Sequence, residues 1–152
     1  MSWHLIGRLQ TNKVKDVVRL GAAVQSLDSL KLCQALAQRA AAVAQRMQVY
    51  VQVNISEEPQ KAGVAPADLP PLVAAARAAS WLDVRGLMAI PKPSDDEAEQ
   101  RAAFRKLRQL AEQLSLPELS MGMSDDLELA IEEGATMVRV GTALFGERPE
   151  DA

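Results

Sequence analysis

Small and hydroxyl-bearing residues occur in two stretches near the C-terminal end of the 152-residue chain, where they could bind a phosphate group. One stretch contains Gly122, Met123 and Ser124, and the other contains Gly141 and Thr142. Backbone amides and hydroxyls at the start of a helix can donate hydrogen bonds to an anion, and a glycine lets the anion approach the backbone. The pattern favours a phosphate site at Ser124, Gly141 and Thr142. Helix capping by the two hydroxyls and a tight turn at Gly141 remain open as alternatives.

Arg139 is the one charged residue in the apolar run from Met137 to Val140. Alternation along a strand puts Arg139 on the face opposite Val138 and Val140. If the two valines face covering helices, the guanidinium points to the inside of the sheet. It needs an acceptor there, because an unpaired buried charge is costly. The acceptor could belong to a ligand, or it could be a carboxylate of the protein.

Three further residues could react or bind ligands but carry weaker signals. Lys61 lies on a predicted loop, where a lysine is usually solvated, although it could also contact a ligand. His4, the only histidine, has no Cys, Asp or Ser partner at a suggestive spacing, so we expect a core histidine. The single cysteine, Cys33, lies on the apolar face of a helical pattern and is expected to be a small core residue. We therefore predict no catalytic residue and no metal site.

A regular alternation of strands and helices must position these residues. Strands are predicted at 3–7, 23–27, 48–55, 82–90, 119–122 and 136–140, and the main helices at 13–20, 29–47, 66–79 and 95–115. Gly21 and Gly134 should end the helices before them, and Ser94 should cap the charged helix. The alternation predicts an α/β fold with a parallel sheet, either open or closed into a barrel. Ligands of such sheets bind at the carboxyl ends of the strands, which Ser124 and Thr142 directly follow.

Composition limits the classes of partner. The net charge is −3 and the basic residues are scattered, so we expect neither a nucleic acid nor an anionic membrane as partner. No apolar run approaches the roughly 20 residues of a membrane span, and the N-terminus lacks a charged-then-apolar leader. We predict a cytoplasmic protein with one domain over residues 1–152.

Four blocks that run from one end of the chain to the other resemble the pyridoxal 5′-phosphate homeostasis proteins, the YggS/PROSC type. They are WHLIGRLQTNK (3–13), QVNISEEPQKAG (52–63), RGLMAIP (85–91) and LSMGMSDDLELAIEEGATMVRVGTALFG (119–146). The resemblance implies a (β/α)8 barrel, the TIM barrel, similar to the barrel of alanine racemase. It also implies that the protein carries and buffers pyridoxal phosphate without catalytic turnover, with pyridoxal-phosphate-dependent apo-enzymes as further partners.

The same resemblance implies a role for each candidate residue. Ser124, Gly141 and Thr142 match the phosphate-binding positions of the family. Arg139 matches the arginine that faces the pyridine nitrogen, and Met123 lies beside the cofactor. An arginine there keeps the nitrogen unprotonated, so the ring is a weaker electron sink than one paired with an aspartate.

Two blocks of the family have no counterpart in the sequence. One resembles AVSKT and carries the lysine that binds the cofactor covalently, and the other resembles FGEN. The count of six predicted strands, against eight in a closed barrel, also suggests that two βα units are missing.

We therefore expect an N-terminally truncated, incomplete barrel whose six βα units correspond to strands 3–8. It would hold the phosphate half of the site and would not bind the cofactor covalently. A racemase-like or decarboxylase-like pyridoxal phosphate enzyme and a non-functional remnant stay open as alternatives.

Overall fold

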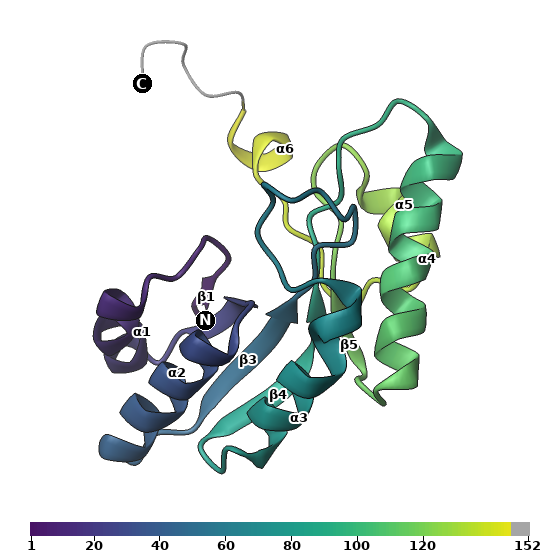
Figure 1. Ribbon diagram of the computed structural model, residues 1–152. Helices are drawn as coiled ribbons and strands as arrows, with labels where there is room; N and C mark the ends of the chain where they lie inside the picture. The colour runs from purple at the N-terminus through teal and green to yellow at the C-terminus, as the bar shows by residue number, and fades with distance from the viewer. Residues whose placement is uncertain (147–152) are drawn as a thin grey trace.

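The computed structural model describes residues 1–146 and contains a curved parallel sheet of five strands in the order β1-β2-β3-β4-β5 (Figure 1). All four pairs of neighbouring strands are parallel. Parallel neighbours need a connection that returns the chain to the starting edge of the sheet, and helices provide it here. The strands are β1 His4–Leu5, β2 Ala23–Leu27, β3 Met47–Gln52, β4 Leu82–Met88 and β5 Glu118–Ser120.

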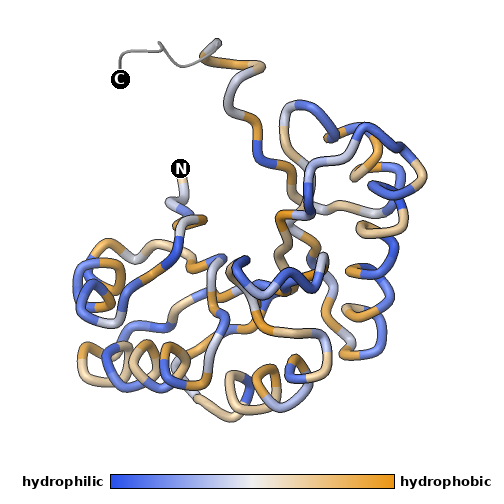
Figure 2. The backbone as a smooth tube through the Cα atoms, turned by 45° about the horizontal axis from the view of Figure 1, so that its top comes forward, coloured by the Kyte–Doolittle hydropathy of each residue, from blue (hydrophilic) through white to orange (hydrophobic). Residues whose placement is uncertain are grey.

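The larger helices α1 to α4 follow one another around the outer side of the curved sheet (Figures 1 and 2). Helical elements are η1 Thr11–Lys13, α1 Val14–Leu20, α2 Leu30–Ala42, η2 Pro66–Asp68, α3 Leu69–Ala78, α4 Glu97–Gln113, α5 Leu127–Glu132 and α6 Thr142–Phe145. Figure 2 shows hydrophobic and hydrophilic residues alternating along these helices, as expected for helices with one buried side. None of the helices within residues 1–146 is long and apolar enough to cross a membrane.

The hydrophobic core lies between the sheet and these helices. Val24, Leu27 and Val49 of the strands and Leu36 of α2 are 0% exposed. Cys33 belongs to the same core with 3% exposure, and burial raises the pKa of its thiol. The prediction that Cys33 is a core residue is therefore confirmed.

The opposite face of the sheet is polar and strongly curved. The Ser120 hydroxyl of β5 donates to Gln25 Oε1 of β2 at 2.5 Å, although β3 and β4 lie between these two strands. Gly86 of β4 pairs with Tyr50 of β3 on one side and with Glu118 of β5 on the other. The Tyr50 hydroxyl donates to the Glu118 carboxylate, because Gly86 has no side chain to separate them. Contacts between strands that are not neighbours show that the sheet curls into a half-barrel.

The predicted sixth strand, 136–140, is not a regular strand, so the count of six βα units is not confirmed. Met137 makes a single parallel bridge with Ser120, and the Arg139 amide donates to the Gly122 carbonyl at 2.9 Å. Gly122 has a φ of +92°, so the chain after β5 turns and leaves no extended partner for a longer ladder. The segment runs beside β5, but it forms only isolated hydrogen bonds.

Helix boundaries also differ from the prediction, and the largest difference is at the end of α2. Helix α2 ends at Ala42 rather than at Met47, because Ala44 adopts a left-handed φ of 52° and Met47 already belongs to β3. Gly21, with a φ of 65°, ends α1 as predicted, and Gly134 follows α5 with a φ of 102°.

The N-cap of α4 is Asp96 and not Ser94. The Asp96 carboxylate accepts a hydrogen bond from the Ala98 amide at 2.8 Å. A cap must directly precede the first helical residue, which is Glu97 here, and Ser94 is too far upstream. Ser94 instead accepts a hydrogen bond from the Asp96 amide at 3.1 Å, which orders the turn before the helix.

Candidate functional site

A cavity of about 630 Å³ lies at the carboxyl ends of β4 and β5. Ile90, which follows β4, lines one part of it, and Gly122, Met123 and Asp126 of the loop after β5 line another. Arg139 also reaches its wall. Ligands of parallel α/β sheets bind at this edge, because the loops that follow the strands converge there.

Arg139 is a buried cation held by neutral acceptors. The residue is 9% exposed, and its Nη1 and Nη2 atoms donate to Ser120 Oγ at 2.8 Å and to the Ala89 carbonyl oxygen at 2.9 Å. The side chain therefore points to the inside of the sheet, as predicted. Burial lowers the pKa of the guanidinium, and the Asp126 carboxylate acts in the opposite direction. An arginine stays charged at neutral pH despite such a shift.

The guanidinium is not paired with a carboxylate within residues 1–146, since both of its acceptors are uncharged. Those two hydrogen bonds use two of the five N–H donors of the side chain. The remaining donors can meet an acceptor in the cavity.

The candidate phosphate-binding residues lie together beside the cavity. Ser124 Oγ accepts hydrogen bonds from the backbone amides of Gly141 at 3.2 Å and Ala143 at 3.3 Å. Gly141 is the N-cap of α6 and Thr142 is its first residue. The Ser124 hydroxyl therefore accepts hydrogen bonds from the start of α6, and it does not cap α5, the helix that follows it in the chain. None of the three candidates lines the 630 Å³ cavity itself, whereas Met123 and Arg139 do.

Glycines play different parts in the two loops. A methyl group added to Gly141 would meet no heavy atom within 4 Å, so its backbone is open to approach from outside. A methyl group at Gly122 would lie 2.5 Å from the Ala130 Cβ atom, and the positive φ there also requires glycine. Met123 is anchored through its amide, which donates to Asp126 Oδ1 at 2.6 Å.

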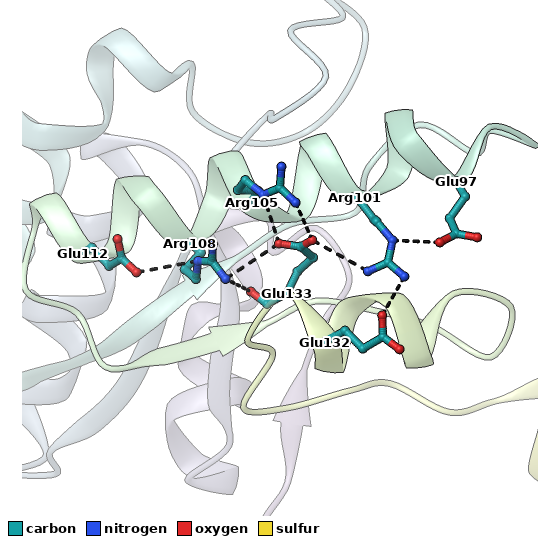
Figure 3. A network of polar contacts seen from close by, with 7 residues as sticks. All are labelled: Glu97, Arg101, Arg105, Arg108, Glu112, Glu132 and Glu133. Carbon is teal, nitrogen blue, oxygen red and sulfur yellow. Dashed lines mark hydrogen bonds and ion pairs between the residues drawn. The ribbon is translucent and has the colours of Figure 1, made fainter.

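Helix α5, which follows the loop, is joined to α4 by a cluster of charges (Figure 3). The Glu133 carboxylate, with a side chain only 7% exposed, lies 2.9 Å from Arg105 Nη2 and 3.7 Å from nitrogen atoms of Arg101 and Arg108. The hydrogen bond from Arg105 lowers the pKa of Glu133. This cluster holds in place the helix that begins directly after the Gly122–Asp126 loop.

Two other candidates from the sequence lie outside the site. Lys61 Nζ forms an ion pair with Glu58 Oε2 at 2.8 Å within its own loop, and Lys61 does not line the cavity. His4 Nδ1 lies 2.9 Å from Gln25 Nε2 on the polar face of the sheet. Within residues 1–146, no group of His, Cys, Asp and Glu residues is placed to hold a metal ion.

The sequence did not single out Gln25 and Ser120, although both are buried, Ser120 against Arg139 and Gln25 against Ser120. Each is a buried polar residue inside a predicted strand with apolar residues at both of its sides in the sequence or close to them, and Gln25 shares its strand with a second polar residue, Ser26. That combination is the signal that could have marked them, because a buried polar side chain requires a hydrogen-bond partner.

Comparison with known proteins gives a consistent result along the chain. Residues 2–149 match the family model for the alanine racemase N-terminal domain. The chain is 49% identical over 150 residues to the pyridoxal phosphate homeostasis protein of Pseudomonas aeruginosa, which covers 97% of this chain and 65% of that protein. It is 44% identical over 154 residues to the protein of the same name from Aquifex aeolicus, covering 97% of this chain and 68% of that protein.

Solved structures agree with the sequence relatives. PipY of Synechococcus elongatus, solved with pyridoxal phosphate bound, superposes with a TM-score of 0.89 and 38% identity over 96% of this chain and 71% of PipY. Alanine racemase of Clostridium difficile superposes with a TM-score of 0.80 over 99% of this chain and 41% of the enzyme. Its identity is 14%, so that likeness concerns the fold alone.

Proposed function

We propose that this chain, which belongs to the alanine racemase N-terminal domain family and within it to the pyridoxal phosphate homeostasis proteins, binds pyridoxal 5′-phosphate to carry and buffer it. The observation that carries the proposal is the buried Arg139 at the wall of a 630 Å³ cavity, with Ser124 and Gly141 gathered beside it. The function needs binding only, and we assign no residue a catalytic role.

The phosphate end of the ligand would lie at Ser124, Gly141 and Thr142. The Ser124 hydroxyl and the start of α6 already lie within hydrogen-bond distance of each other. Thr142 adds a second hydroxyl, and its amide, as the first of the helix, has no acceptor within the helix. The open space around Gly141 supports close approach of an anion to the backbone. These groups fit a phosphate.

The ring end would lie against Arg139 and Met123. The guanidinium can only donate hydrogen bonds, so a ring nitrogen beside it must accept and stays unprotonated. When bound, pyridoxal phosphate supplies an aldehyde and an electron-withdrawing ring, which is weaker as an electron sink when the nitrogen carries no proton. Arg139 thus favours storage of the cofactor over catalysis with it, and the Met123 side chain offers an apolar wall.

We further infer that β1 to β5 and the bridged segment 136–140 correspond to strands 3–8 of a (β/α)8 barrel, with residues 1–152 in one domain. The superposition on PipY supports this correspondence. We also propose that pyridoxal-phosphate-dependent apo-enzymes in the cytoplasm receive the cofactor from this protein.

Calorimetric titration with pyridoxal phosphate, pyridoxal and inorganic phosphate tests the function. We expect pyridoxal phosphate to bind more tightly than pyridoxal. Ser124→Ala combined with Thr142→Val should reduce that preference by about tenfold, because charge-assisted hydrogen bonds to the phosphate are lost. Ser80→Ala, an exposed serine outside the site, is the matched control.

Equal affinity for pyridoxal and its phosphate would contradict the assignment of the phosphate end. An absence of binding would favour the non-functional remnant, and racemisation of amino acids by the chain with added cofactor would favour the enzyme alternative.

A further inference from the structure

Four side chains form a continuous line of hydrogen bonds on the polar face of the sheet. Arg139 Nη1 donates to Ser120 Oγ at 2.8 Å, and the Ser120 hydroxyl donates to Gln25 Oε1 at 2.5 Å. Gln25 Nε2 then lies 2.9 Å from His4 Nδ1. The line thus joins the wall of the cavity to the first strand of the sheet. Gln25 and Ser120 are 1% and 0% exposed, so water cannot replace these bonds.

The chemistry of the Arg139 end sets the direction of every bond in this line. A guanidinium has donors only, so Ser120 Oγ must accept a hydrogen bond from Arg139. The Ser120 hydroxyl must then donate its own hydrogen bond to Gln25 Oε1. The Gln25 amide therefore turns its NH2 group toward His4. Met137 Sδ, 3.1 Å from the same Nε2 atom, carries no hydrogen and can only accept. Two independent contacts thus require the same orientation of Gln25.

This direction leaves one arrangement for His4. Because Gln25 Nε2 donates, His4 Nδ1 must accept, and the ring hydrogen must reside on Nε2. A hydrogen on Nδ1 would face the hydrogens of Gln25.

We propose that Gln25 is a positioning residue for Arg139. Gln25 accepts a hydrogen bond from the Ser120 hydroxyl, which turns the free electron pairs of the Ser120 oxygen toward the guanidinium. The guanidinium of Arg139 is thereby fixed at the cavity wall. His4 closes the line as the Nε2–H tautomer. The contact between Arg139 and the cofactor ring rests on the proposed function, whereas the hydrogen-bonded line and its effect on Arg139 do not.

The first test needs no cofactor. His4 is the only histidine, so long-range ¹H–¹⁵N spectra of the intact chain report on one imidazole ring. In the neutral ring, Nε2 should carry the hydrogen and Nδ1 should show the shift of a hydrogen-bonded acceptor. A hydrogen on Nδ1 would overturn the proposal.

The second test asks whether Gln25 acts on Arg139. In the wild type the Arg139 guanidinium should give resolved signals of slow rotation, which Arg139→Lys identifies by their loss. In Gln25→Leu those signals should average, because the guanidinium rotates faster. The ¹⁵N chemical shift of His4 Nδ1 should move toward that of a nitrogen without a hydrogen bond. Gln109→Leu, an exposed glutamine on α4, should change neither signal. Arg139 signals that remain resolved in Gln25→Leu would overturn the proposal.

The third test is a double-mutant cycle on affinity for pyridoxal phosphate. Gln25→Leu should weaken binding by about tenfold, the effect of one misplaced hydrogen bond to a charged group. Gln25→Leu added to Arg139→Lys should cost much less than the two separate losses combined, because Gln25 acts through Arg139. Fully additive losses would overturn the proposal. Thermal melting of each variant shows whether it is folded.

The Arg139 and His4 signals keep the two proposals separable. If these signals behave as expected and the wild type binds no cofactor, the proposed function fails and the positioning role of Gln25 stands.

Discussion

The hydroxyl oxygen of Ser124 lies 3.2 Å from the backbone nitrogen of Gly141, although 17 positions separate the two residues in the chain. The same oxygen lies 3.3 Å from the Ala143 nitrogen. One side chain therefore joins the loop after β5 to the start of α6, so the two halves of the candidate phosphate site depend on each other.

Replacing this hydroxyl should release the start of α6 without unfolding the sheet. We expect Ser124→Ala to speed hydrogen exchange at the amides of residues 141 and 143. The free energy of unfolding should fall by at most about 1 kcal/mol, the usual cost of a lost helix cap. Exchange measured by NMR checks this, with Ser80→Ala as control. Unchanged protection of both amides would contradict the role of Ser124.

A methyl group at Gly141 should affect the ligand and not the protein. Because no heavy atom lies within 4 Å of the added carbon and φ is −118°, Gly141→Ala should change stability by less than about 0.5 kcal/mol. Affinity for pyridoxal phosphate should nevertheless fall, since the methyl group occupies space beside the backbone amides. Calorimetry and thermal melting measure the two effects. Unaltered affinity would place the phosphate elsewhere.

Gly86 should be far more sensitive to the same substitution. An added carbon would lie 1.9 Å from the backbone oxygen of Glu118, and backbone atoms of a neighbouring strand cannot move away easily. We expect Gly86→Ala to destabilise the chain by about 3 kcal/mol or more, at the upper end of overpacking effects. Gly7→Ala is the matched control, because nothing lies within 4 Å there. Denaturant titrations measure the free energy of unfolding of both variants. Similar values would show that β4 and β5 separate readily.

Glu133 should stabilise the fold in a pH-dependent way. Its pKa in the folded state is lowered, chiefly by the hydrogen bond from Arg105. The folded state therefore binds the proton less readily than the unfolded state. The stabilisation is complete above the unfolded pKa and is lost as the pH falls through the folded one. Glu133→Gln should cost about 1–3 kcal/mol at neutral pH.

That loss should shrink on acidification, because protonation removes the same charge from the wild type. Unfolding free energies of the wild type and Glu133→Gln at about pH 7 and about pH 3 test this difference. Glu112→Gln is the control: its carboxylate is 67% exposed and 3.6 Å from Arg108, and such surface pairs contribute little. A deficit of Glu133→Gln that stays constant with pH would contradict the assignment.

Local sequence patterns predicted the strands of the core well. The strand at Ala23–Leu27 has the predicted bounds, and β3 and β4 lie within predicted strands apart from one residue at the start of β3. Except for the half-buried Val84, their β-branched and apolar residues are buried, so local propensity and tertiary packing favour the same structure. The prediction of a strand at 136–140 failed for a non-local reason. The chain after the neighbouring strand β5 turns at Gly122, and an apolar run cannot form a ladder with a strand that has ended.

The candidate site was only partly predictable. Arg139, Ser124 and Gly141 could be proposed because their residue types carry chemistry. The pairing of Gln25 with Ser120 could not, since the two residues are 95 positions apart and no periodic pattern links them. Such contacts depend on how strongly the sheet curls, which local propensity does not set.

The strand order has a consequence for how the protein is made. Each strand pairs with the strand that precedes it in the chain, so the sheet can grow one unit at a time as the ribosome delivers it. His4 and Gln25 emerge before Ser120 and Arg139, because they precede them in the chain. The hydrogen bonds from Ser120 to Gln25 and from Arg139 to Ser120 form only when β5 and the 136–140 segment dock. Within residues 1–146, the part of the cavity wall that Arg139 forms is therefore completed only after all five strands have been made, and a nascent chain stalled before Arg139 lacks it.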